Sequence, residues 1–138
     1  LFKDTMQLAA FNNNNFTLGH ASMMVNEGLP LYLVSRMEER FELSTLKVGI
    51  LGMAFKSESD DIRSSLSYKL RRILRFKADE VLCADPYVTD DPTLISQEEV
   101  IRQSDVLVIG SPHNAYKGLI TTTPVIDVWN LLGNGTVI

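Results

Sequence analysis

The sequence predicts an α/β fold, in which a doubly wound parallel sheet follows a long helical arm that is kinked at a proline. Two observations predict the sheet. From residue 46 on, short and wholly apolar segments alternate with amphipathic helical segments, which is typical of parallel strands covered by helices on both faces. Three apolar segments also end at turn residues, namely Gly52, Asp85-Pro86 and Gly110-Ser111-Pro112. This order of elements is Rossmann-like, and ligands of such sheets bind outside the carboxyl ends of the strands.

The first part of the chain is predicted to be helical. Residues 3–10 can form a helix, which the asparagines at 12–15 interrupt. Residues 17–41 follow a helical pattern with apolar side chains on more than one side, so this helix should be covered on more than one side. Pro30 is expected to kink this helix or to split it near Leu29. We therefore divide the chain into a helical segment, residues 1–43, and a sheet domain, residues 44–138.

The sheet domain should contain four strands and the start of a fifth. The strands are expected at residues 47–52, 81–84, 106–109 and 124–128, and the fifth begins at residue 136. Helices are expected at residues 64–77 and 96–103, with one further helical turn at 113–117. Ser96 and Glu99 have the spacing of a capping box, which marks the start of the second of these helices.

Composition limits the classes of partner. The formal net charge is −4, which disfavours nucleic acid or an anionic membrane as the main partner, and no apolar run is long enough to span a membrane. The one cysteine, Cys83, allows no disulfide framework and indicates a reducing, cytoplasmic location; inside a strand it should be a buried apolar filler. The chain starts at Leu1 and stops within an apparent strand, so we expect it to be a fragment of a longer protein.

The stretch from Val48 to Arg63 is the best candidate for a ligand site. It reads as strand, glycine, charged loop and helix start, and Lys56 and Arg63 add positive charge to the helix N-terminus, which suits an anionic ligand. A dinucleotide fingerprint would need G-x-G-x-x-G here, but only Gly49 and Gly52 are present. The loop is therefore not predicted to be a primary NAD site.

The acidic residues of this loop allow two interpretations. Glu58, Asp60 and Asp61 could form a metal site, but we favour no metal. Instead one aspartate should cap the following helix and the other should orient Lys56 or Arg63. His113, at the end of the third strand, is interpreted as a loop or capping residue.

The loop resembles a known family. The stretch GMAFKSESDDIRSS is similar to the opening of the C-terminal domain of UDP-glucose/GDP-mannose dehydrogenases, whose pattern is close to G-x-A-F-K-x-x-x-D-D-x-R-x-S. The matching residues are Gly52, Ala54, Phe55, Lys56, Asp60, Asp61, Arg63 and Ser65. Leu1-Phe2-Lys3-Asp4 resembles the end of the family's C-x-x-K-D segment, directly after the catalytic cysteine, and residues 26–30 resemble its long central helix.

The resemblance implies an activity and roles for residues. The family oxidises the C6 alcohol of a nucleotide sugar to a carboxylate with NAD and a catalytic cysteine. By resemblance, Phe55 and Lys56 contact the nucleotide sugar, Lys3 and Arg63 lie near NAD that is bound mainly by another domain, and Asp4 acts beside the cysteine. The helix at Thr17–Phe41 would form a homodimer. Without the cysteine, this chain alone is expected to be inactive.

One position departs from the family pattern. Where the family has Asp-x-Arg near the fourth strand, this chain has Asp127-Val128-Trp129. Trp129 could stack on a base or a sugar, or simply pack. The nucleotide sugar therefore stays open between the UDP-glucose, UDP-N-acetylmannosamine and GDP-mannose types. The alternative to an enzyme part is a non-catalytic module for nucleotide binding or dimerisation.

Overall fold

The computed structural model describes residues 2–13 and 15–134, and it confirms the predicted fold class. Four parallel strands lie in the order β2-β1-β3-β4. The strands are β1 (Lys47–Leu51), β2 (Glu80–Ala84), β3 (Val106–Ile109) and β4 (Val125–Ile126). The helices are α1 (Phe2–Phe11), α2 (Thr17–Glu38), α3 (Leu66–Leu74) and α4 (Gln97–Gln103), and the short 3₁₀ helices are η1 (Leu43–Thr45) and η2 (Asn114–Tyr116).

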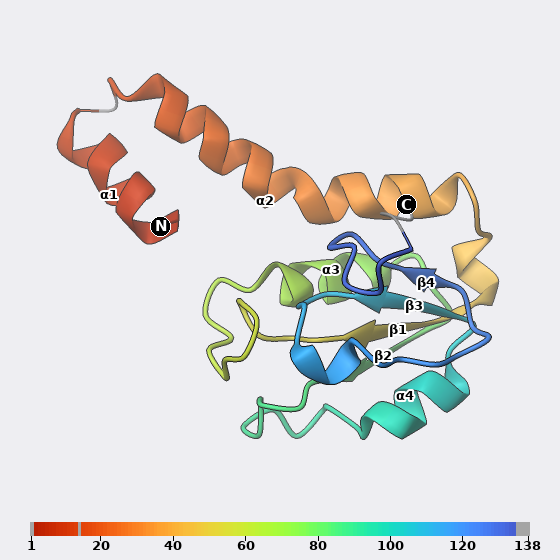
Figure 1. The fold of residues 1–138 in the computed structure, drawn as a ribbon. Coiled ribbons are helices and arrows are strands. Elements are labelled where there is room, and N and C mark those ends of the chain that lie inside the picture. The colour runs from red at the N-terminus through yellow and green to blue at the C-terminus, as the bar shows by residue number, and fades with distance from the viewer. Residues whose placement is uncertain (1, 14, 135–138) are drawn as a thin grey trace.

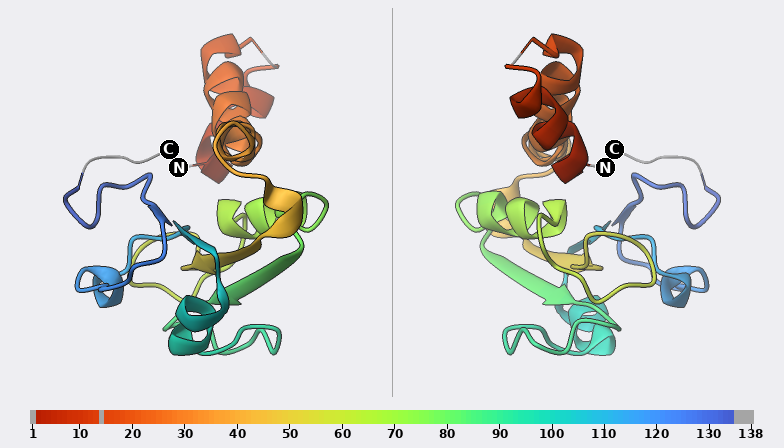
Figure 2. Two further views of the ribbon diagram at one scale, coloured as in Figure 1. Left: turned by 90° about the vertical axis from the view of Figure 1, so that its right-hand side faces the viewer. Right: turned by 90° about the vertical axis from the view of Figure 1, so that its left-hand side faces the viewer.

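Helices cover both faces of the sheet, as Figure 2 shows. Side chains alternate along β1, so Val48 and Ile50 pack in a cluster with α2 and α3. Leu51 faces the opposite side, in a cluster with Val100 of α4 and with Tyr116. Gly49 lets α4 lie close to the sheet, because a Cβ there would lie 2.3 Å from Oγ of Ser104. The carboxyl end of the central strand β1 is thereby fixed between two packed layers.

The helical arm, α1 and α2, lies against the α3 side of the sheet and extends beyond it (Figure 1). Helix α2 continues through Pro30, so the predicted split near Leu29 is wrong, while the kink stays a prediction. The carboxyl-terminal half of α2 belongs to the core, with Leu33, Val34 and Met37 all buried. Lys69 of α3 pairs with Glu27 of α2, which ties the arm to the domain midway along the helix.

Local capping changes some of the predicted boundaries. Helix α3 begins at Leu66 because Oγ of Ser65 accepts the Ser67 amide at 3.2 Å. The prediction that Asp60 or Asp61 caps this helix is therefore wrong. Ser96 caps α4 as predicted, accepting the Glu99 amide at 3.2 Å.

Strand β4 is shorter than predicted. It ends at Ile126 because the side chain of Asp127 binds the next amides along the chain. Its two oxygens accept from Trp129 at 3.1 Å and from Leu132 at 2.8 Å, which turns the backbone away from the sheet. The predicted fifth strand lies outside the described residues. No helix in the described part of the chain is long and apolar enough to span a membrane.

Candidate functional site

The loop after β1 is held at its start by Asp85, which follows β2. Oδ2 of Asp85 accepts the amides of Met53 at 2.6 Å and Ala54 at 2.9 Å. Gly52 has φ of +94°, and a Cβ there would lie 2.6 Å from the backbone of Ser111. Phosphates of a dinucleotide bind free amides at this point of a Rossmann fold. Here a carboxylate already holds two of them, so the structure agrees with the absent glycine fingerprint.

The second half of the loop is held by the segment after β3. The Ser57 hydroxyl donates to the carbonyl of Pro112 at 2.8 Å. The Glu58 amide donates to Nδ1 of His113 at 3.0 Å, and the Glu58 carboxylate accepts the Asn114 amide at 2.8 Å. Tyr87, after β2, donates its hydroxyl to the same carboxylate at 2.7 Å. The loop is thus fixed by residues that follow β2 and β3, the two strands on either side of β1.

These contacts keep the two carboxylates ionised. Burial acts to raise the pKa of Asp85, but the amides of Tyr87, Ala54 and Met53 outweigh it, so the pKa lies below its usual value. The Asn114 amide, with the hydroxyl of Tyr87, likewise lowers the pKa of Glu58. Both groups therefore remain strong hydrogen-bond acceptors at neutral pH.

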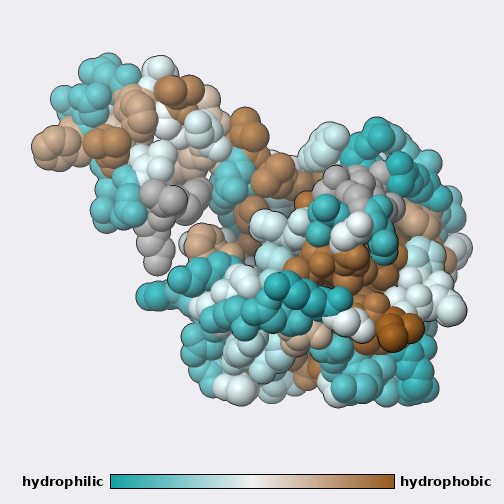
Figure 3. Space-filling model, viewed as in Figure 1, coloured by the Kyte–Doolittle hydropathy of each residue, from teal (hydrophilic) through white to brown (hydrophobic). Residues whose placement is uncertain are grey.

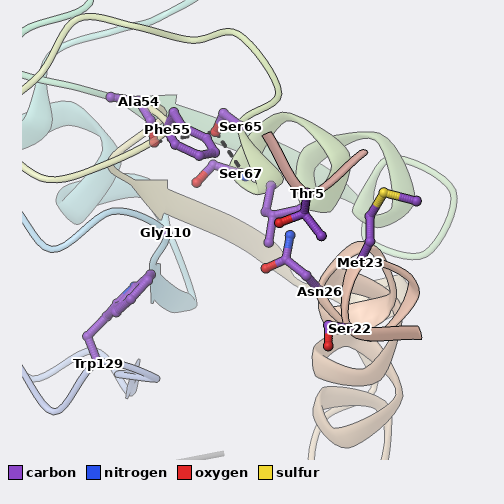
Figure 4. A pocket seen from close by; sticks show the side chains of 11 residues that line it. Thr5, Ser22, Met23, Asn26, Ala54, Phe55, Ser65, Ser67, Gly110 and Trp129 are labelled. Carbon is purple, nitrogen blue, oxygen red and sulfur yellow. Dashed lines mark hydrogen bonds between the residues drawn. The ribbon is translucent and has the colours of Figure 1, made fainter. Parts of the chain in front are cut away.

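A cleft of about 340 Å³ opens between this loop and the arm (Figure 4). Phe55, which is 44% exposed, and Trp129, which is 54% exposed, line it from the sheet domain. The arm forms the opposite wall of the cleft. Gly110 and the start of α3 form the wall nearest the sheet. The remaining lining residues are Thr5, Ser22, Met23, Asn26, Ala54, Ser65, Leu66 and Ser67.

A second hollow of about 360 Å³ continues the cleft along α2. The two share Asn26, Leu66, Ser67, Gly110 and Trp129, so they form one continuous groove. The second hollow is more apolar, because it is lined by Leu29, Pro30, Leu33, Leu70, Val108 and Val128 among others. The groove thus has one end lined in part by hydroxyl and amide side chains, which is the first cleft, and a more apolar end, which is the second hollow. Trp129 lines both.

The structure brings together only some of the predicted site residues. Phe55 and Trp129 line the same cleft, while Lys56 is exposed next to Phe55 and is not a lining residue. Arg63 is exposed and pairs with Asp61 through two hydrogen bonds of 2.8 Å. That pair raises the pKa of Arg63 and matches the prediction that one aspartate orients Lys56 or Arg63.

The residues at the start of the chain lie in α1. Asp4 is exposed, and its neighbour Thr5 reaches the cleft. The side chain of Lys3 lies outside the described residues. The predicted roles of Lys3, Asp4, Phe55, Lys56, Arg63 and Trp129 stay predictions.

Cys83 is confirmed as a buried filler. It is 3% exposed in β2, and burial raises the pKa of its thiol to about 11, so it is a poor nucleophile at neutral pH. His113 is the N-cap residue of η2 in the loop after β3, in agreement with the prediction, although its side chain makes no capping hydrogen bond. It is fully buried, and its Nε2 lies 3.1 Å from Oδ2 of Asp85. Within the described residues, no group of three or more His, Cys, Asp or Glu side chains is placed to hold a metal ion.

Sequence reasoning missed the contribution of the arm to the site. Asn26 and Ser22 lie on α2, and Ser67 lies on α3, so they meet only in the folded chain. A faint signal existed, because Asn26 is a polar residue in a helix that is otherwise largely apolar. The buried pair of Asp85 and His113 was also missed, although both residues follow predicted strands.

The chain is similar in sequence to known proteins. The model of the UDP-glucose/GDP-mannose dehydrogenase family, UDP binding domain, matches residues 49–134. A UDP-N-acetyl-D-mannosamine dehydrogenase from Pyrococcus horikoshii is 30% identical over 122 residues, which cover 85% of this chain and 29% of that protein. A UDP-glucose 6-dehydrogenase from Haloferax volcanii is 37% identical over 71 residues, covering 51% of this chain and 16% of that protein.

Solved structures show the same fold. The structure of the Pyrococcus horikoshii UDP-D-ManNAc dehydrogenase has a TM-score of 0.82 at 29% identity, covering 99% of this chain and 35% of that one. A UDP-glucose dehydrogenase from Pyrobaculum islandicum has a TM-score of 0.80 at 28% identity, covering 91% of this chain and 32% of that one. The chain thus spans about a third or less of the length of these relatives. On the match of the family's UDP binding domain to most of the chain, this protein belongs to the UDP-glucose/GDP-mannose dehydrogenase family.

Proposed function

We propose that this chain is the nucleotide-sugar-binding and dimerisation part of an NAD-dependent dehydrogenase that oxidises the C6 alcohol of a nucleotide sugar to a carboxylate. One observation carries the proposal: the groove between the arm and the carboxyl end of the sheet, lined by Phe55 and Trp129. Ligands of open α/β sheets bind at this edge. Family membership disfavours the alternative of a non-catalytic module for nucleotide binding or dimerisation.

The groove supplies the contacts that a nucleotide sugar needs. Trp129 is held by the Asp127 turn with about half of its surface exposed, so its indole can stack on a base or a sugar ring. Asn26 and Ser67 offer donors and acceptors for hydroxyl groups. Lys56, which is exposed and follows Phe55 in the chain, would provide a positive charge for a diphosphate. We infer a UDP sugar rather than GDP-mannose, since the two relatives compared above are named for UDP sugars.

NAD would act as the hydride acceptor. The loop after β1 does not fit it as a primary site, because Asp85 holds the amides of Met53 and Ala54. The side chain of Arg63 is 74% exposed and fits a supporting contact to an anionic cofactor held elsewhere. Lys3 and Asp4, at the start of α1, would lie near the reaction.

The chain alone should not catalyse the reaction. Its sole cysteine, Cys83, is buried with a raised pKa and is not one of the residues that line the groove. The covalent chemistry of the family therefore needs a nucleophile from outside these residues. We also infer a cytoplasmic location, in keeping with a single buried cysteine and a nucleotide-sugar substrate.

The arm is proposed to form a homodimer. Apolar side chains on the surface of α2 are largely exposed in the single chain, as Figure 3 shows for the arm. They are Leu18 (72%), Met24 (56%), Val25 (69%), Leu31 (62%) and Tyr32 (59%). A surface of this kind is covered in stable proteins, and a second copy of α2 would cover it.

A fluorescence titration tests the binding role, because Trp129 is the only tryptophan. UDP, UDP-N-acetyl-D-mannosamine, UDP-glucose and GDP-mannose are titrated into the 138-residue chain. We expect the UDP compounds to change the emission in a saturable way. Calorimetry on Trp129→Ala should show binding that is about 5- to 150-fold weaker, since aromatic stacking contributes about 1–3 kcal/mol.

A matched control is Phe76→Ala, which removes an aromatic side chain that is 85% exposed beyond the end of α3. It should bind like the wild type. If calorimetry detects no binding of any of the four compounds to the wild-type chain, the proposed function is wrong.

A further inference from the structure

Asp85 and His113 are buried polar residues that contact the loop carrying Phe55 and Lys56, and neither of them lines the groove. Asp85 follows β2 and His113 follows the end of β3, and β1 lies between these strands. Both side chains have no exposed surface. Buried polar groups with no solvent contact are retained only where hydrogen bonds satisfy them. What these two groups bind is the backbone of the loop.

The pair holds the loop at two points. Asp85 binds the amides of Met53 and Ala54, directly before Phe55. His113 binds the amide of Glu58, two residues after Lys56. Phe55 and Lys56 are therefore enclosed between two fixed backbone segments. Glu58 has φ of +54°, a conformation that non-glycine residues adopt only when surrounding contacts impose it.

The hydrogen bonds define one tautomer of His113. Nδ1 accepts from the Glu58 amide at 3.0 Å, so the ring proton must be on Nε2, where it faces Oδ2 of Asp85 at 3.1 Å. Four titratable groups face the ring. Two are carboxylates, that of Asp85 after β2 and that of Glu58, whose Oε1 lies 3.8 Å from Nδ1. The other two are the phenols of Tyr87 and Tyr116, whose ring centres lie 4.9 and 5.7 Å from the centre of the imidazole.

Protonation of His113 would change this arrangement. A proton on Nδ1 would point at the N–H of Glu58, so two donors would face each other and the bond would be lost. The Glu58 carboxylate, at 3.8 Å, is placed to accept the new N–H instead. The carboxylate can do so while keeping the Asn114 amide and the Tyr87 hydroxyl, since each of its oxygens accepts two hydrogen bonds. The backbone amide of Glu58, however, loses its partner, so the second half of the loop is no longer held by His113.

We propose that His113 is a positioning residue that, backed by Asp85, holds Phe55 and Lys56 in their binding conformation, and that protonation of His113 opens this clamp. The clamp itself is a property of the loop. Its effect on ligand affinity rests on the proposed function.

Three variants of the 138-residue chain test the clamp. His113→Phe keeps an aromatic ring and removes both ring nitrogens. His113→Asn keeps an acceptor near the position of Nδ1 but, unlike an imidazole, does not take up a proton as the pH is lowered. Tyr116→Phe is the matched control, because Tyr116 is equally buried beside His113 but its hydroxyl lies at the Ala84 carbonyl and the Gly52 amide and not at Glu58.

The first readout is hydrogen exchange of the Glu58 amide by NMR, expressed as protection relative to the intrinsic rate at each pH. Loss of one hydrogen bond corresponds to roughly tenfold less protection in His113→Phe at about pH 7.5. As the pH is lowered, the wild type should lose protection, because a proton on Nδ1 removes the acceptor of the Glu58 amide. His113→Asn should stay protected as the pH is lowered, and Tyr116→Phe should follow the wild type.

The second readout is the affinity for UDP, followed by Trp129 fluorescence. The affinity should weaken in parallel with the protection of the Glu58 amide, roughly tenfold in His113→Phe. His113→Asn should bind UDP as the wild type does, with an affinity that does not depend on pH. Equal Glu58 protection in His113→Phe and the wild type, or the same pH dependence in His113→Asn, would overturn the clamp. If protection behaves as expected but the wild type binds no nucleotide, the clamp stands and the proposed function fails. Should His113→Phe not fold, the comparison of His113→Asn with the wild type across pH decides the question.

Discussion

Oδ2 of Asp85 accepts the amide of Met53 at 2.6 Å, across two parallel strands and 32 residues of sequence. The same carboxylate also binds the amides of Ala54, Tyr87 and Val88. One buried side chain thus organises the ends of both β1 and β2. In a dinucleotide-binding domain the anion at this point would be the ligand; here it belongs to the protein.

Asp85→Asn should lower the free energy of unfolding by about 1–3 kcal/mol. The amide keeps one oxygen acceptor but turns an NH₂ group toward backbone donors, and buried donors without acceptors are costly. Urea unfolding followed by circular dichroism measures the loss. Asp79→Asn, at an exposed position before β2, is the control and should change stability little. Equal stability of Asp85→Asn and the wild type would contradict the organising role.

Acid should destabilise the domain through Asp91. Burial acts to raise the pKa of Asp91, but hydrogen bonds from Thr93 and Tyr68 and the charge of Arg71 lower it to about 2. The folded-state pKa of Asp91 lies below the unfolded-state value of about 3.9, so the ionised carboxylate stabilises the fold at pH values above about 3.9. This stabilisation is lost as the pH falls toward the folded-state pKa. The melting temperature should therefore drop between about pH 4 and pH 2.

Asp91→Asn isolates this contribution. It should melt lower than the wild type at neutral pH and show a flatter dependence on acid. Asp90→Asn, at the exposed neighbouring position, should keep the wild-type profile. A wild-type acid profile in Asp91→Asn would show that other carboxylates are responsible.

Lys56→Ala should weaken binding of UDP sugars about tenfold or more, because the proposed role of this exposed residue next to Phe55 is to pair with the diphosphate. Lys56→Arg should retain most of the affinity, and added salt should weaken the wild type more than Lys56→Ala. Calorimetry at two salt concentrations measures both effects. Lys117→Ala removes an exposed lysine from the end of η2 and serves as the control. Unchanged affinity in Lys56→Ala would remove Lys56 from the site.

Val25→Glu should weaken the proposed dimer at least about tenfold, because a charge would be buried in an apolar contact between two α2 helices. Sedimentation equilibrium over a range of protein concentrations measures the dissociation constant. Ile120→Glu introduces the same charge at a position that is 95% exposed outside the arm, and it should leave the dimer intact. A wild-type chain that stays monomeric at high concentration would contradict the proposal.

The sequence by itself determined the elements and the motif of the loop. The apolar strand segments and the Ser96 cap were predicted correctly as local features, because the residues that decide them are neighbours in the chain. The boundaries that were wrong depend on side chains that bind nearby amides. Ser65 rather than Asp60 or Asp61 caps α3, and Asp127 ends β4 after two residues.

Only the tertiary structure decided how these parts combine into a site. The order β2-β1-β3-β4 places Asp85 and His113 on either side of the β1 loop, and no pattern along the chain states which strands are neighbours. The packing of α2 on α3 likewise brings Asn26 to the same groove as Trp129. Such contacts join residues tens to about a hundred positions apart, so they follow from which surfaces are buried together and not from local preference.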